Sequence, residues 1–129
     1  MGAVLPALAS GPPALGYLRV LRHDPRGPQF WAWAISGFCV ARGLALRCVF
    51  ADAEVTGGAA PNWEGWRLLL AYLGGQAEMT TVVVPALVHL SGDLARQRRM
   101  CAQVAAAGGL VQPLSPVAAG CLPSRDGEA

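Results

Sequence analysis

The segment TTVVVP, Thr80–Pro85, decides the fold that we expect for this chain of 129 residues. Its middle is β-branched and apolar without alternation, which is typical of a strand buried on both faces. Such strands belong to parallel sheets, in which helices cover both faces and connect successive strands. We therefore expect strands and helices to alternate along the chain on either side of this segment.

Working outward from this strand, the apolar pattern predicts further strands at 15–21, 44–50 and 110–113, and helices at 29–42, 62–73 and 91–107. Gly43 is a favoured helix end, and Asn62 and Ser91 are favoured N-caps. The expected fold is therefore α/β, a mostly parallel sheet of about four or five strands with helices on both faces. Right-handed crossovers place the first strand in the centre, between the second and the third.

Composition limits the class of protein. With 53% hydrophobic and 14% charged residues, we expect one packed domain at 14–114, between loose tails at 1–13 and 115–129 that are rich in Gly, Pro and Ala. A net charge of +2 is too small to indicate nucleic-acid binding by itself. We expect a cytoplasmic protein without membrane association, because no apolar run could span a bilayer and no basic leader begins the chain. The four cysteines are expected as free thiols.

Ligand sites in parallel sheets lie beyond the carboxyl ends of the strands. Five basic or imidazole side chains follow the first and third strands: Arg19, Arg22, His23, Arg26 and His89. They form a candidate site for DNA or another anion, and a solvated polar loop is the alternative interpretation. No metal or other cofactor is expected, because Asp52 and Glu54 offer too few oxygen ligands. The last predicted helix carries three arginines: Arg96, Arg98 and Arg99. We expect them to form the solvent-exposed face of this helix, and a contact with DNA is the alternative interpretation.

Three stretches of the chain resemble the catalytic domain of the serine recombinases, the resolvase/invertase family. They are GYLRV at 16–20, ARGLALRCVFADAEVTGG at 41–58 and WEGWRLLLAYLGGQAEMTTVVVPALVHLSGDLA at 63–95. The family's counterparts are Arg-Val-Ser, then Asp-Glu-x-Val-Ser-Gly, then Val-Val-Val followed by Leu-Asp-Arg-Leu-Ser-Arg-Asp. The resemblance covers residues 15–113 and implies the three-layer resolvase fold.

The resemblance does not extend to the residues that perform the reaction. In that family a serine attacks a DNA phosphodiester, and arginines stabilise the charge on the phosphate. Arg19 matches the first of these arginines, but Leu21 stands at the position of the nucleophile. The other replaced positions are Pro25 for a glutamine, Trp63, His89 and Gly92 for arginines, and Val88 for an aspartate. An N-cap role explains Ser91, so we do not expect it to replace the nucleophile.

The chain also departs from the family after its last strand. A serine recombinase continues there into a long helix used for dimerisation and DNA contact, and then usually into a DNA-binding domain. Here the sequence is PLSPVAAGCLPSRDGEA at 113–129, with prolines near its start and no helical periodicity. We therefore expect neither part in this chain.

The helix expected at 29–42 is unusual, because QFWAWAISGFCVA at 29–41 contains no charged residue. A helix on a sheet needs one apolar stripe, so apolar residues nearly all round indicate a second buried face. Large aromatic side chains are frequent at protein interfaces. Four aromatic residues are the candidate interface: Phe30, Trp31, Trp33 and Phe38. The alternative is that the tails fold over this helix.

The sequence therefore favours a catalytically inactive resolvase-like domain that serves as a protein-binding or self-assembly module. Its expected partner is a second copy or another protein, with weak DNA binding possible and no membrane. A DNA-associated regulatory or accessory protein, which binds phosphates through the basic strand ends, is the alternative hypothesis. An active recombinase with displaced chemistry is the third.

Overall fold

The computed structural model describes residues 11–53 and 63–114, in which strands and helices alternate. The elements are β1 (Pro13–Val20), α2 (Pro28–Arg42), β2 (Ala45–Ala53), α3 (Glu64–Gly74), β3 (Thr80–Val84), the short 3-10 helix η1 (Leu87–His89), α4 (Leu94–Ala106) and β4 (Gly109–Pro113). Their order is the predicted one, with η1 as an addition. Both expected tails lie largely outside the described residues, except that β1 begins already at Pro13.

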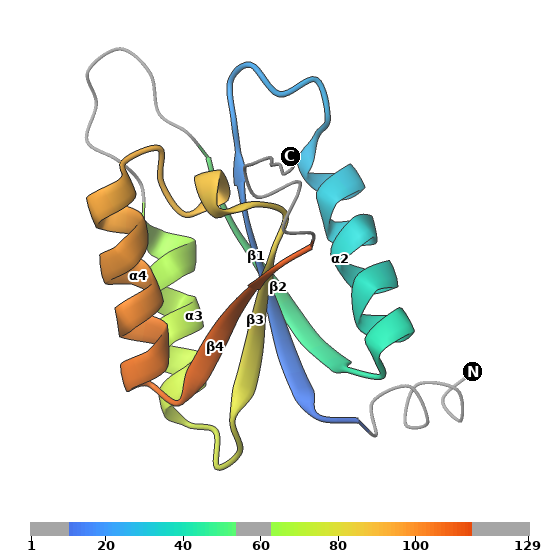
Figure 1. Ribbon diagram of the computed structural model, residues 1–129. Coiled ribbons are helices and arrows are strands. Elements are labelled where there is room, and N and C mark those ends of the chain that lie inside the picture. The colour runs from blue at the N-terminus through green and yellow to red at the C-terminus, as the bar shows by residue number, and fades with distance from the viewer. Residues whose placement is uncertain (1–10, 54–62, 115–129) are drawn as a thin grey trace, which may run out of the picture.

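The sheet has the strand order β2-β1-β3-β4, and every neighbouring pair is parallel. The expected α/β class and the central place of β1 between β2 and β3 are thus confirmed. Helix α2 covers one face of the sheet, and α3 and α4 cover the other (Figure 1). Because the strands are parallel, their carboxyl ends meet at one edge, where the loops after β1 and β3 lie together.

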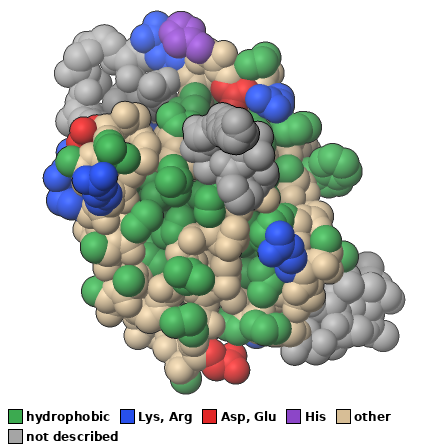
Figure 2. Space-filling view, viewed as in Figure 1, with side chains coloured by type: hydrophobic (Ala, Val, Ile, Leu, Met, Phe, Trp, Pro, Cys, Tyr) green, Lys and Arg blue, Asp and Glu red, His purple; other side chains and the backbone are tan. Residues whose placement is uncertain are grey.

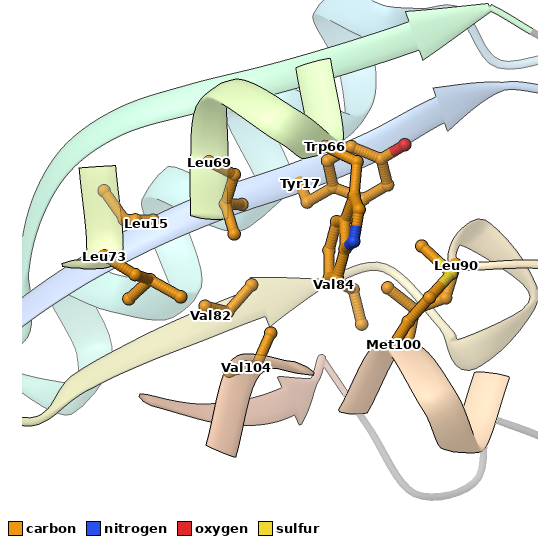
Figure 3. Packing of buried hydrophobic residues seen from close by; sticks show 10 residues of the cluster. All are labelled: Leu15, Tyr17, Trp66, Leu69, Leu73, Val82, Val84, Leu90, Met100 and Val104. Atoms are coloured by element: carbon orange, nitrogen blue, oxygen red, sulfur yellow. The ribbon is translucent and has the colours of Figure 1, made fainter. Parts of the chain in front are cut away.

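The core forms on both faces of β1 and β3. In β1, Leu15 and Tyr17 pack toward α3 and α4, whereas Ala14 and Leu18 pack toward α2. Strand β3 has both faces buried, as its unbroken apolar run predicts. Figure 3 shows the larger cluster, made of Leu15, Tyr17, Trp66, Leu69, Leu73, Val82, Val84, Leu90, Met100 and Val104. This packing fixes the strand ends that carry the candidate site.

The first turn of α3 is held by a carboxylate from β2. Asp52 accepts hydrogen bonds from the backbone N–H groups of Gly65 and Trp66, at 2.6 and 3.0 Å. Such a contact satisfies donors that the helix leaves without internal partners. A Cβ on Gly65 would lie 2.6 Å from the carbonyl oxygen of Ala51, so glycine permits this close approach. The N-cap of α3 is Trp63, whose side chain makes no capping hydrogen bond, so the expectation of Asn62 in this place was wrong. Asn62 itself lies outside the described residues.

The start of α4 differs from the prediction. The N-cap is Asp93, whose side chain accepts from the backbone N–H of Arg96 at 3.1 Å. The expectation of Ser91 in this place was wrong, because η1 occupies the preceding residues and delays the helix. Gly43 does end α2, in a left-handed conformation with φ of 69°. In the described ranges, no helix is long and apolar enough to cross a membrane.

Candidate functional site

A pocket of about 890 Å³ lies at the carboxyl ends of β1 and β3. Its walls come from the loop after β1, the first turn of α2, the residue before α3, and the connection from β3 to α4. Figure 2 shows basic and histidine side chains at the top of the molecule, where Figure 1 places the loop after β1. Four of the five predicted anion-site residues line the pocket: Arg19, His23, Arg26 and His89. The fifth, Arg22, is exposed and does not contribute to the lining.

Arg19 places a nearly buried positive charge in this pocket, since it is only 7% exposed. One of its terminal nitrogens donates to the Tyr17 hydroxyl at 3.4 Å, and its guanidinium carbon lies 4.4 Å from the centre of the Trp63 ring. No carboxylate among the described residues forms a salt bridge with Arg19. Because a buried charge without a counter-ion is costly, this guanidinium favours an incoming anion.

His89 lies beside Arg19 and is 2% exposed. Its Nδ1 accepts a hydrogen bond from the backbone N–H of Arg19 at 3.1 Å. Burial lowers the pKa of His89 to about 4, so the imidazole is neutral at neutral pH. A neutral imidazole that accepts at Nδ1 carries its proton on Nε2. The ring therefore offers one N–H donor and no charge.

Asp24 also lines the pocket, and it connects the loop after β1 to helix α2. Its carboxylate accepts from the backbone N–H of Arg26 at 2.9 Å and from the indole N–H of Trp31 at 2.9 Å. The backbone hydrogen bond from Arg26 is the main cause that lowers the pKa of Asp24. The Arg26 guanidinium also lies 3.5 Å from this carboxylate and 4.7 Å from the centre of the Trp31 ring. Asp24 therefore offsets the charge of Arg26 but not that of Arg19.

Among the lining residues outside the predicted anion site, Arg96 and Trp63 contact each other. Arg96 is exposed, as predicted, but it also lines the pocket, and its guanidinium carbon lies 5.2 Å from the centre of the Trp63 ring. Its place in the first turn of α4, directly after the connection that carries His89, brings Arg96 to the pocket. Trp63, which stands where the resemblance implies an arginine, is thus in contact with two arginines.

The replaced positions of the resemblance also meet in this pocket. Leu21, Val88 and Gly92 line it, so the side chains at these positions are apolar or absent. Among the described residues that line the pocket, only Ser91 carries a hydroxyl, and its Oγ accepts from the backbone N–H of Asp93 at 3.1 Å. The arrangement can bind an anion, but no hydroxyl stands at the end of β1.

The four predicted interface residues on α2 separate into two pairs. Phe30 and Trp33 are exposed, by 42% and 73%. Trp31 lines the pocket, and Phe38 packs into the core beneath α2. Val40 is also exposed, by 63%, on the same side of the helix as Trp33.

The described residues contain no group of three or more histidine, cysteine, aspartate or glutamate side chains that could hold a metal. Asp52 is engaged with α3 and Tyr17, and Glu54 lies outside the described residues. Three free thiols are described, at Cys39, Cys48 and Cys101, whereas Cys121 falls outside these ranges.

The fold is that of serine recombinase catalytic domains. The chain is similar to the N-terminal catalytic domain of TP901-1 integrase, with a TM-score of 0.65, 17% identity, and coverage of 79% of this chain and 76% of that one. It is also similar to the C-terminal catalytic domain of ISC1926 TnpA, an IS607-like serine recombinase, with a TM-score of 0.62 and 15% identity. That similarity covers 79% of this chain and 70% of that one. A third similar structure is a resolvase family site-specific recombinase from Streptococcus pneumoniae, with a TM-score of 0.67 and 12% identity. That similarity covers 80% of this chain and 72% of that one. No protein-family model and no curated protein sequence matches the chain.

Proposed function

We propose that this resolvase-like domain does not cleave DNA and that it works by associating with a second copy through α2. The observation that carries the second part is a row of exposed apolar side chains on the outer side of this helix, which no other described residue covers. Phe30, Trp33 and Val40 are exposed there, whereas Ile35 and Cys39 of the same helix face the sheet. Exposed apolar side chains add little to the stability of an isolated domain, so this row of two aromatic residues and a valine favours an interface.

The loss of cleavage is inferred from the pocket. A phosphoryl-transfer site of this kind needs an activated hydroxyl and several groups that stabilise charge. Leu21 stands where the resemblance implies the hydroxyl, and Val88 and Gly92 stand where it implies a carboxylate and a guanidinium. The hydroxyl of Ser91 is engaged by the backbone of Asp93 and has no base within hydrogen-bond reach among its described contacts.

A second copy suits the surface of α2 better than a charged partner does. Residues 29–41 carry no charge, so two copies of the helix do not repel each other. Gly37 lies on the same outer side, and a Cβ placed on it would meet nothing within 4 Å. A glycine at this place allows two helix backbones to approach closely, while Trp33 and Val40 pack on either side. A twofold dimer would use the same patch twice.

The test is the mass of the protein in solution, measured by light scattering over a series of concentrations. The native chain should be a dimer, and Trp33→Glu should be a folded monomer. Leu94→Glu is the matched control, because Leu94 is an exposed apolar residue on α4 and should leave the dimer intact. A native chain that stays monomeric at its highest soluble concentration would refute self-association.

DNA binding is a second candidate function, favoured by the basic residues at the end of the sheet. Arg19, Arg26 and Arg96 line one pocket. When arginines contact the phosphates of DNA, the affinity for DNA falls steeply as the salt concentration rises. A gel shift with duplex DNA at rising salt tests this function. Binding that is strong at low salt and is lost by Arg96→Gln would support it.

A further inference from the structure

We propose that the pocket at the ends of β1 and β3 binds a small organic anion, in which a carboxylate or phosphate monoester is joined to a flat, largely apolar body. This proposal is independent of self-association through α2. It follows from the chemistry of two parts of the pocket, a polar floor and apolar walls.

The polar floor contains a guanidinium that forms no direct salt bridge with a carboxylate of the described residues. Arg19 can donate five hydrogen bonds, yet among the described residues its side chain donates one, to the Tyr17 hydroxyl at 3.4 Å. The nearest carboxylate in this network, Asp52, is occupied by Tyr17 and by the start of α3. An oxyanion on Arg19 would therefore supply the missing counter-charge and accept the remaining N–H donors.

Two neighbouring groups complete an oxyanion site. The Nε2–H of His89 has no hydrogen-bond acceptor among the described residues. The ring is almost fully buried, lines the pocket and makes a T-shaped contact with Trp31, with 5.4 Å between the ring centres. Arg96 brings a second guanidinium to the Trp63 ring that Arg19 also contacts. The three donors belong to different elements, so the fold itself brings them together.

Most of the remaining lining residues are apolar, although His23, Asp24, Arg26 and Ser91 also line the pocket. The Asp24 carboxylate is already engaged by Arg26 and Trp31. Leu21, Val88 and Pro25 line the pocket, and Trp31 and Trp63 add two indole rings. The volume of about 890 Å³ is far larger than a phosphate ion needs, and it lies within the range of roughly 300–1,000 Å³ that holds small organic ligands. A ligand that fills this space must therefore carry an apolar body beside its charge, and flat rings pack well against indoles.

Arg19 and His89 are buried in the pocket, and their burial favours a small ligand over duplex DNA. Arg19 and His89 are 7% and 2% exposed, so they can be reached only by a group that enters the pocket. Phosphates of an undistorted duplex lie on the outside of a wide rod and meet side chains that project from a surface. Two exposed arginines also line the pocket, Arg26 and Arg96, and Asp24 already offsets the charge of Arg26.

Calorimetric titration of the full chain at low salt tests the proposal. The probes are naphthalene-2-carboxylate, 2-naphthyl phosphate, the uncharged 2-naphthamide, and inorganic phosphate. We expect saturable binding of at least one naphthyl anion to one site per chain, and binding at least about tenfold weaker for the amide and for inorganic phosphate. The stronger of the two anions identifies the carboxylate or the phosphate ester as the natural head group.

Variants at the rim keep the test separate from folding. Arg96→Gln should weaken the binding of the naphthyl anion by about tenfold. Arg98→Gln, on an exposed part of the same helix, should leave this affinity unchanged. Val88→Asp should weaken the binding of the anion, because it adds a negative charge to the pocket. Val88→Asn, which has the same size without the charge, should weaken this binding less. The proposal is overturned if the amide binds as tightly as the anions, if Arg96→Gln and Arg98→Gln behave alike, or if a short DNA duplex displaces the anion at stoichiometric amounts.

Discussion

The hydroxyl of Tyr17 donates a hydrogen bond of 2.7 Å to Oδ2 of Asp52, and this contact joins β1 to β2 beneath the pocket. The same hydroxyl accepts from Arg19, and the same carboxylate accepts from the first turn of α3. Burial is the main cause that raises the pKa of Tyr17, and the contact with Asp52 adds to it, so the hydroxyl keeps its proton. One carboxylate thus positions a helix and, through Tyr17, the guanidinium of Arg19.

Asp52→Ala should therefore destabilise the fold more than the loss of an ordinary helix cap. It leaves buried donors on Tyr17, Gly65 and Trp66 without an acceptor, and we expect a loss of about 3 kcal/mol in the free energy of unfolding. Asp93→Ala removes the exposed cap of α4 and should cost about 1 kcal/mol. Urea denaturation of both variants measures the difference, and equal losses would show that Asp52 is a simple cap.

Gly65→Ala tests the close approach of α3 to the end of β2. The added Cβ would lie 2.6 Å from the carbonyl oxygen of Ala51, so the helix must shift, and the cost should be about 2 kcal/mol or more. Gly74→Ala, at the other end of α3, meets nothing within 4 Å and should change stability by no more than about 1 kcal/mol. Thermal unfolding followed by circular dichroism compares the two. If Gly65→Ala is as stable as the native chain, the close approach at Gly65 does not determine where α3 lies.

The stability of the domain should fall as the pH falls below neutrality, because of His89. Burial lowers the pKa of this residue from the ordinary 6.5 to about 4, with a smaller opposing effect from Asp24. Between these two pH values the unfolded chain binds a proton that the folded chain does not, so acid favours unfolding. The stabilisation is complete above pH 6.5 and is lost as the pH falls toward 4, by up to about 1.4 kcal/mol per pH unit.

The measurement is the free energy of unfolding in urea at pH 7, 6 and 5. His89→Gln should reduce the slope with pH, since the amide oxygen can still accept from Arg19 but does not titrate. His23→Gln removes the exposed histidine of the neighbouring loop and is the control for the loss of an imidazole by the same substitution. If His89→Gln and the native chain have the same slope, His89 is not the group responsible.

The sheet could be predicted from the sequence because its causes are local. The apolar run Val82–Val84 requires burial on both faces, and Gly43 marks the end of a helix by its conformation. The helix starts were harder to predict, because they depend on contacts through space. Asp52 holds α3 from another strand, and Asp93 rather than Ser91 begins α4 after a short turn that has no clear sequence signal.

The pocket could be predicted only in part. Its position follows from the parallel strands, which is why Arg19 and His89 were expected near each other. Trp31 was expected at an interface because helical spacing places it on an apolar face, yet Asp24 holds its indole at the pocket. The contacts of Arg19 and Arg96 with Trp63 join three elements, and no local pattern indicates such a junction.

Restoring the hydroxyl at the end of β1 should not restore DNA cleavage. Leu21→Ser places a serine in the pocket, but a hydroxyl is a poor nucleophile unless its surroundings activate it and stabilise charge on the phosphate. Val88 and Gly92 provide neither, and His89 already uses Nδ1 to accept from Arg19. Because each lost donor typically costs about 100- to 1,000-fold in rate, and groups that act together do not recover singly, no product should be measurable. The assay is nicking of supercoiled DNA, together with detection of a covalent protein–DNA adduct, and the native chain is the control. An adduct through the introduced serine would show that the remaining residues of the pocket still support the reaction, and that the domain has lost its nucleophile alone.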